Sequence, residues 1–195
     1  MARRFISQLS TLVGLGGVML WAPSAQALPG ESVETVAAWI AAHPTLRPGP
    51  NEVLVVNRAE TPARRFTFRA TIFPVTGLVP GIQLQRIIRT EQITLVDTVE
   101  GTSAKRLEES LRAIYDANLY SDYQLATVVY SYPNSFSPFP TNDAILRQGE
   151  LRVGDRYGYW LELTANQSGF VYSGTLAVID QADMPRLQAR LQGTE

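Results

Sequence analysis

One histidine, His43, is the only side chain that changes charge near neutral pH, which makes it the first candidate for acid–base chemistry. A general base needs a carboxylate or a nucleophile beside it, and the sequence does not place one there. His43 stands before Pro44 at the end of a predicted helix, where a histidine commonly binds free carbonyl groups and favours the helix dipole. The pattern therefore favours a structural role.

Carboxylates are the second source of chemistry. None has the spacing of a calcium loop, and the adjacent Glu108 and Glu109 point in different directions on a predicted helix. The chain has no cysteine, which excludes zinc–thiolate, iron–sulfur and thiol-nucleophile sites. We expect no catalytic residue, no metal site and no cofactor. The carboxylates in the middle of the chain, which we call the central carboxylates, are Asp97, Glu100, Glu108, Glu109, Asp116 and Asp122.

The segment 131–142 is predicted as a long loop that three prolines stiffen. It carries the large apolar side chains of Tyr132, Phe136 and Phe139 with little regular structure to bury them. Long ordered loops often carry function, and these rings would form a rigid docking surface for a partner protein. Alternatively, the phenylalanine rings pack back onto the sheet. Both interpretations remain open.

A second aromatic group lies on two strands joined by a turn at 166–169. The alternation places Tyr157 and Tyr159 on one face of their strand and Trp160 on the other, with Tyr172 on the next strand. These rings would line an apolar ligand pocket or stack on a sugar. Cross-strand packing in the core is the more common role of such a set.

Arginines gather near the strongest strand signal. If they converge, they would bind an anionic group through paired hydrogen bonds. Exposed positions on a strand face are the ordinary alternative. The residues are Arg64, Arg65, Arg69, Arg86 and Arg89.

The elements that must position these groups follow the order helix, strands, helix, strands, helix. Ser32 caps a helix that runs to about Ala42, a second helix follows Ser103, and a third starts after Asp180 or Asp183. We predict one α+β domain over 28–195, with an antiparallel β-sheet covered by about three helices in the order α-β(n)-α-β(n)-α. The predicted strands are 53–56, 66–72, 82–96 (one bent strand or two), 124–130, 144–153, 157–164 and 170–179.

Residues 1–27 have the pattern of a cleavable signal peptide. Arg3 and Arg4 precede an apolar run, 9–22, that is too short to cross a bilayer as a helix, and Ala25-Gln26-Ala27 matches a signal-peptidase site. We predict an extracytoplasmic protein, periplasmic or secreted, with no membrane span after cleavage. General-secretory and twin-arginine export both remain open.

The formal net charge of −1 argues against a nucleic-acid partner. The segments 55–58 (Val-Val-Asn-Arg) and 61–68 (Thr-Pro-Ala-Arg-Arg-Phe-Thr-Phe) resemble small exported cyanobacterial proteins of unknown function. This resemblance covers about the first half of the mature chain and implies no activity. It would place the protein in the periplasm or the thylakoid lumen.

Three functions follow from the sequence. The leading hypothesis is a non-enzymatic binding or accessory protein for another extracytoplasmic protein, acting through 131–142 and the adjoining strands. The second is a carrier of a lipid or another apolar small molecule. The third is a hydrolase that depends on carboxylates, with or without His43.

Overall fold

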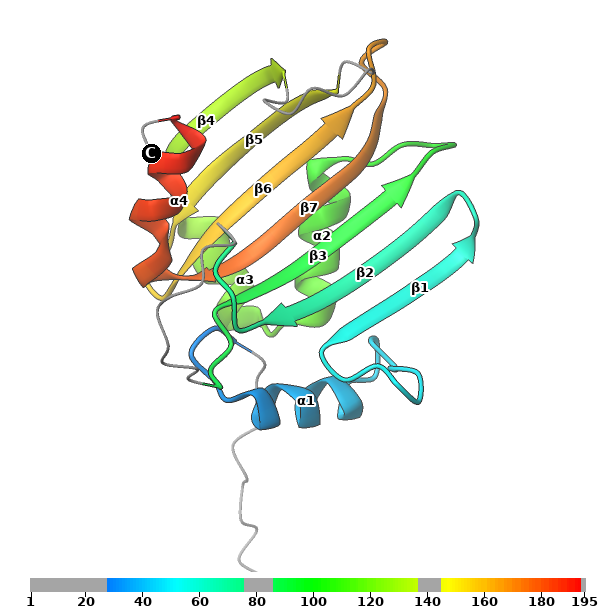
Figure 1. Cartoon of the computed structure of the whole chain (residues 1–195), viewed down its shortest axis with the longest axis vertical. Helices are drawn as coiled ribbons and strands as arrows, with labels where there is room; N and C mark the ends of the chain where they lie inside the picture. Colours follow the sequence, from blue (N-terminus) through cyan, green and yellow to red (C-terminus); the bar gives the residue numbers. More distant parts are fainter. Residues whose placement is uncertain (1–27, 76–85, 137–144, 194–195) are drawn as a thin grey trace, which may run out of the picture.

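The computed structural model describes residues 28–75, 86–136 and 145–193, and it contains a seven-stranded sheet in which every neighbouring pair is antiparallel (Figure 1). The strand order is β1-β2-β3-β7-β6-β5-β4. The predicted mixed α+β class with an antiparallel sheet is therefore confirmed. The strands are β1 (Val55–Thr61), β2 (Arg64–Thr71), β3 (Thr90–Asp97), β4 (Thr127–Phe136), β5 (Leu146–Val153), β6 (Tyr157–Ala165) and β7 (Val171–Asp180).

The sheet is made of two runs of sequential strands joined at the centre. The first run is β1–β2–β3 and the second is β4–β5–β6–β7. They meet where β3 pairs with β7, from Thr90 opposite Ile179 to Val96 opposite Ser173. Because that pairing is central, the two runs form one continuous layer.

Three helices cover one face of the sheet, which we call the helix face: α1 (Val33–Ala42), α2 (Ala104–Ile114) and α3 (Ala117–Leu125). Figure 1 shows α2 and α3 behind the sheet and α1 along its lower end. Side chains of Ser32, Ser103 and Asp116 cap the three N-termini, as expected for these residue types. The main core lies here and includes Val36, Ile40, Phe68, Ile93, Leu107, Leu111, Leu119, Tyr123, Tyr159 and Leu176.

The opposite face is covered at one corner by the C-terminal helix α4 (Met184–Leu191), which follows the short 3-10 helix η1 (Gln181–Asp183). Met184 and Leu187 pack on Leu151, Ala177 and Ile179 in a second small core. The side chains of Arg89 and Asp183 form a paired hydrogen bond, with distances of 2.8 and 2.7 Å, that holds the start of α4 to the chain just before β3.

Two predictions about the middle of the chain are wrong. Residues 117–125 form helix α3, where the sequence suggested a strand from Gln124, because Asp116 caps a helix and Leu119 and Tyr123 bury one side of it. Residues 131–136 belong to strand β4 and not to a loop. Pro133 is tolerated there because β4 is an edge strand.

The described residues contain four α-helices, against about three in the prediction. None of the helices in the described ranges is long and apolar enough to cross a membrane. The predicted signal peptide 1–27, the start of the predicted strand 82–96 and Phe139 lie outside the described residues, as does the side chain of Phe136.

Candidate binding surface

The sheet face opposite α1, α2 and α3, which we call the open face, carries a row of polar side chains. The registers place Asn57, Thr67, Thr94, Thr175, Glu162, Gly149 and Tyr132 opposite one another in turn, one residue from each strand. We call these seven residues the polar row. Neighbours within it are bonded: Thr67 donates to Asn57 Oδ1 at 3.1 Å, and the hydroxyls of Thr94 and Thr175 lie 3.3 Å apart.

The β4 end of the polar row contains a compact hydrogen-bonded group. The Tyr132 hydroxyl donates to Glu162 Oε2 at 2.7 Å and accepts from Trp160 Nε1 at 3.0 Å. Arg147 Nη1 lies 3.5 Å from Glu162 Oε1, and the Glu162 side chain is only 13% exposed. Burial and the neighbouring Glu162 raise the pKa of Tyr132, so its hydroxyl stays protonated and remains a donor.

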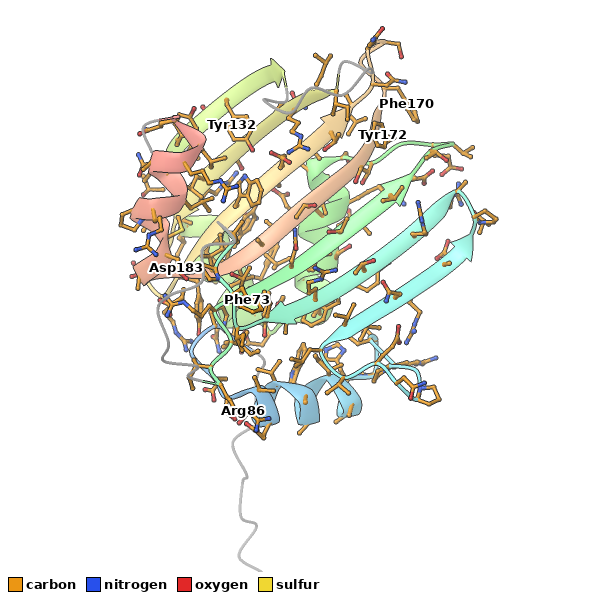
Figure 2. All side chains as sticks on the ribbon, in the orientation of Figure 1. Phe73, Arg86, Tyr132, Phe170, Tyr172 and Asp183 are labelled. Atoms are coloured by element: carbon orange, nitrogen blue, oxygen red, sulfur yellow. The ribbon has the colours of Figure 1, made fainter. Side chains whose placement is uncertain are left out.

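Glycine at position 149 makes this arrangement possible. A Cβ at Gly149 would lie 2.5 Å from the Tyr132 hydroxyl oxygen and 2.6 Å from the Leu161 carbonyl oxygen, distances that a real side chain does not tolerate. The phenol therefore lies over the bare backbone of β5 and reaches Glu162 on β6. Figure 2 shows Tyr132 at this end of the sheet.

Two arginines flank the polar row on β2. Arg65 and Arg69 pair with Val96 and Gln92 on the open face, and both are exposed and have no partner among the described residues. Arg64 points to the helix face, where it binds Asp97 and Glu100 at 3.3 and 2.5 Å.

The five arginines therefore do not converge, and the ordinary alternative of exposed strand positions holds for Arg65 and Arg69. Arg86 pairs with Glu34 at 2.7 Å, and Arg89 is bound to Asp183. Strand alternation explains the separation, because neighbouring residues such as Arg64 and Arg65 must face opposite sides of a sheet.

The aromatic residues proposed for ligand binding are divided between the two cores. Tyr157 and Tyr159 belong to the main core, where the Tyr159 ring meets the Tyr123 ring edge-on at 5.3 Å. Trp160 packs with the second core beside α4. Tyr172, near the far end of β7 in Figure 2, is half-buried. The structure therefore brings together Tyr157 and Tyr159 but not the whole set.

The most unusual titratable group is Glu91 on β3, which faces the main core. Its side chain is fully buried, and Oε2 accepts from the Tyr115 hydroxyl at 2.5 Å. Burial raises the pKa of Glu91 to about 8. The hydrogen bond from Tyr115 lowers this pKa, but by less than burial raises it. Oε1 has no partner among the described residues. Nothing in the sequence singles out Glu91, because its neighbours are those of an ordinary strand.

His43 has a structural role, as the pattern favoured. Its Nε2 donates to the carbonyl oxygen of Ile114 at 2.9 Å, and its Nδ1 accepts from the main-chain N–H groups of Thr45 and Leu46 at 3.2 Å. Both ring nitrogens are therefore occupied, and the residue ties the end of α1 to the end of α2.

Two of the central carboxylates, Asp97 and Asp122, are held by neighbouring donors. Asp97 accepts from Arg106 and from the main-chain N–H of Glu100, and its pKa is lowered to about 2. Asp122 accepts from the Tyr159 hydroxyl and from the N–H of Asp155. No group of three or more possible metal ligands occurs among the described residues.

Comparisons with family models, curated proteins and solved structures found no match to this chain. The resemblance stated for residues 55–68 stays a prediction. The residues of the open face are therefore the basis for a functional proposal.

Proposed function

We propose that this chain is an exported, non-enzymatic binding protein that holds an acidic segment of another extracytoplasmic protein on its open face. The observation that carries the proposal is the polar row with its two flanking arginines. Among the described residues, three helices cover much of one side of the sheet, while α4 covers only a corner of the other. Most of the other described side chains on the open face are polar or charged.

The charge of the open face indicates the charge that a partner should carry. Glu162 and Arg147 form a pair, so they contribute little net charge. Arg65 and Arg69 have no partner among the described residues, and guanidinium groups bind carboxylates through two parallel hydrogen bonds. An acidic segment lying across β2 and β3 would place carboxylates beside both arginines. The threonine hydroxyls of the polar row would form hydrogen bonds with the main chain of that segment, as donors or as acceptors.

The other two functions have less support. An apolar carrier that used Tyr157 and Tyr159 would need those rings to line an accessible space, but Tyr159 is fully buried and Tyr157 nearly so. A hydrolase that used His43 would need a free ring nitrogen, and both are bound to the main chain.

The test uses a fluorescently labelled glutamate-rich peptide as the probe and measures binding by anisotropy at low and high salt. We expect the double variant Arg65→Glu/Arg69→Glu to weaken binding about tenfold, or roughly 1.4 kcal/mol. The matched control is Lys105→Glu/Arg112→Glu, which makes the same total charge change at two exposed positions on α2. Equal weakening by the control, or binding that neither variant changes, would contradict the proposal.

Export is tested separately by the intact mass of the protein recovered from its own extracytoplasmic fraction. Cleavage after Ala27 would give a mature chain that starts at Leu28. Retention of 1–27, or recovery only from the cytoplasm, would remove this part of the proposal.

A further inference from the structure

The outer edges of the two edge strands, β1 and β4, differ in how much of each is contacted by the rest of the chain. The outer edge of β1 is occupied by the segment before it: Glu52 Oε1 accepts from the main-chain N–H of Asn57 at 2.7 Å. The Arg58 side chain donates to the Leu46 carbonyl oxygen from the same edge. β1 is thus shielded over its first half, and its charged Arg58 and Glu60 and the irregularity between Ala59 and Thr61 disfavour pairing with another strand.

The first half of the other edge strand, β4, has no such cover. Among the described residues, only β5 bonds to the main chain of 127–132. Val128 and Val129 are 47% and 39% exposed, and Leu125 just before the strand is 82% exposed. Exposed apolar side chains along an open edge are typical of a strand that pairs with another chain.

The lack of charged residues around β4 indicates which kind of strand can pair with it. No Asp, Glu, Lys or Arg occurs in the segment 123–142, although natural edge strands usually carry charges that repel a second copy. Antiparallel pairing of two identical uncharged strands places no like charges opposite each other. The edge is therefore compatible with its own copy.

We propose that β4 pairs antiparallel with β4 of a second copy of this chain, so that two sheets join into one. β4 is irregular between Val128 and Tyr130 and again between Tyr132 and Ser135, and Pro133 lacks a main-chain N–H, so the pairing uses the two short runs 127–128 and 130–132. The two-fold axis of such a pair is perpendicular to the sheet, so both open faces lie on the same side. Because the β1 edge is shielded, assembly stops at two copies and does not continue into a filament.

The test is sedimentation velocity on the purified protein over a hundredfold range of concentration. We expect a monomer–dimer equilibrium whose dissociation constant rises about tenfold or more in Val129→Lys, because the lysine places two like charges across the two-fold axis. The matched control is Val53→Lys, at a position that is 58% exposed and lies before β1. It should leave the equilibrium unchanged.

A second measurement covers the case in which Val129→Lys does not fold. Hydrogen exchange of the wild-type protein should show amides of 127–132 that become more protected as the concentration rises, while those of β1 do not change. A monomer at every concentration overturns the proposal, as does a dimer that Val129→Lys leaves intact. This inference is independent of the acidic partner, since a monomer would still present the open face.

Discussion

Replacing Glu91 by glutamine should remove a large part of the pH dependence of stability. In the folded protein Glu91 is fully buried with one hydrogen bond, from Tyr115, and its pKa is raised from 4.5 to about 8. Glutamine has nearly the same shape and keeps an oxygen that accepts from Tyr115, but it has no charge to bury.

The sign follows from the raised pKa. Between pH 4.5 and about 8 the folded chain binds a proton at Glu91 that the unfolded chain has released. The contribution of Glu91 to stability is therefore fully present below pH 4.5, declines as the pH rises, and is lost once the pH passes about 8. The difference between the two pKa values corresponds to roughly 5 kcal/mol, which is large for a domain of ordinary stability.

The assay is urea denaturation of the wild type and of Glu91→Gln at a series of pH values across this window. The free energy of unfolding of the wild type should fall with rising pH relative to that of the variant, because every other titratable group is common to both. Glu109→Gln, an exposed change on α2, is the control and should run parallel to the wild type. If the curves for wild type and Glu91→Gln are also parallel, the reasoning about burial is refuted.

Three further variants test the packing around the sheet. Asp183→Asn should lower the free energy of unfolding by about 2 kcal/mol, because Arg89 keeps only the more distant carboxylate of Asp180, at 3.9 Å; hydrogen exchange should show α4 loosening first, and uniform loosening would contradict this. Gly158→Ala should cost about 1–3 kcal/mol by overpacking, since its Cβ meets the Met184 sulfur, and Met184→Ala in the same chain should recover part of the loss in denaturant titrations. Asp97→Asn should flatten the acid limb of stability: the stabilisation from Asp97 is present above its ordinary pKa of 3.8 and is lost as the pH falls through about 2. An unchanged limb in circular dichroism at low pH would refute that assignment.

The sequence correctly predicted the helices and turns that are determined by residues close to one another in the chain. Ser32 and Ser103 cap α1 and α2 as expected, and the turn at 166–169 joins β6 to β7. Helix α3 was missed because its buried side consists of only Leu119 and Tyr123, which gives a weak helical period.

The candidate surface could not be predicted, because it depends on register between distant strands. Thr94 and Thr175 touch across the β3–β7 pairing, and nothing near either residue specifies the other. The same limit applies to His43, whose carbonyl partner is Ile114. The sequence did single out Tyr132, but as part of a loop, because Pro133 is usually evidence against a strand.

The central position of β7 affects how the chain can be assembled as it is made. β7 is the last strand to leave the ribosome, yet it fills the gap between β3 and β6. Until it arrives, the first run of strands ends at an unpaired β3, and the main core lacks Leu176 and Val178. Contacts so distant in sequence slow folding. A partly folded chain that lacks β7 therefore presents an unpaired inner edge, and its final strand has to be inserted between two preformed parts, which makes β3 the strand most exposed to misassembly during folding.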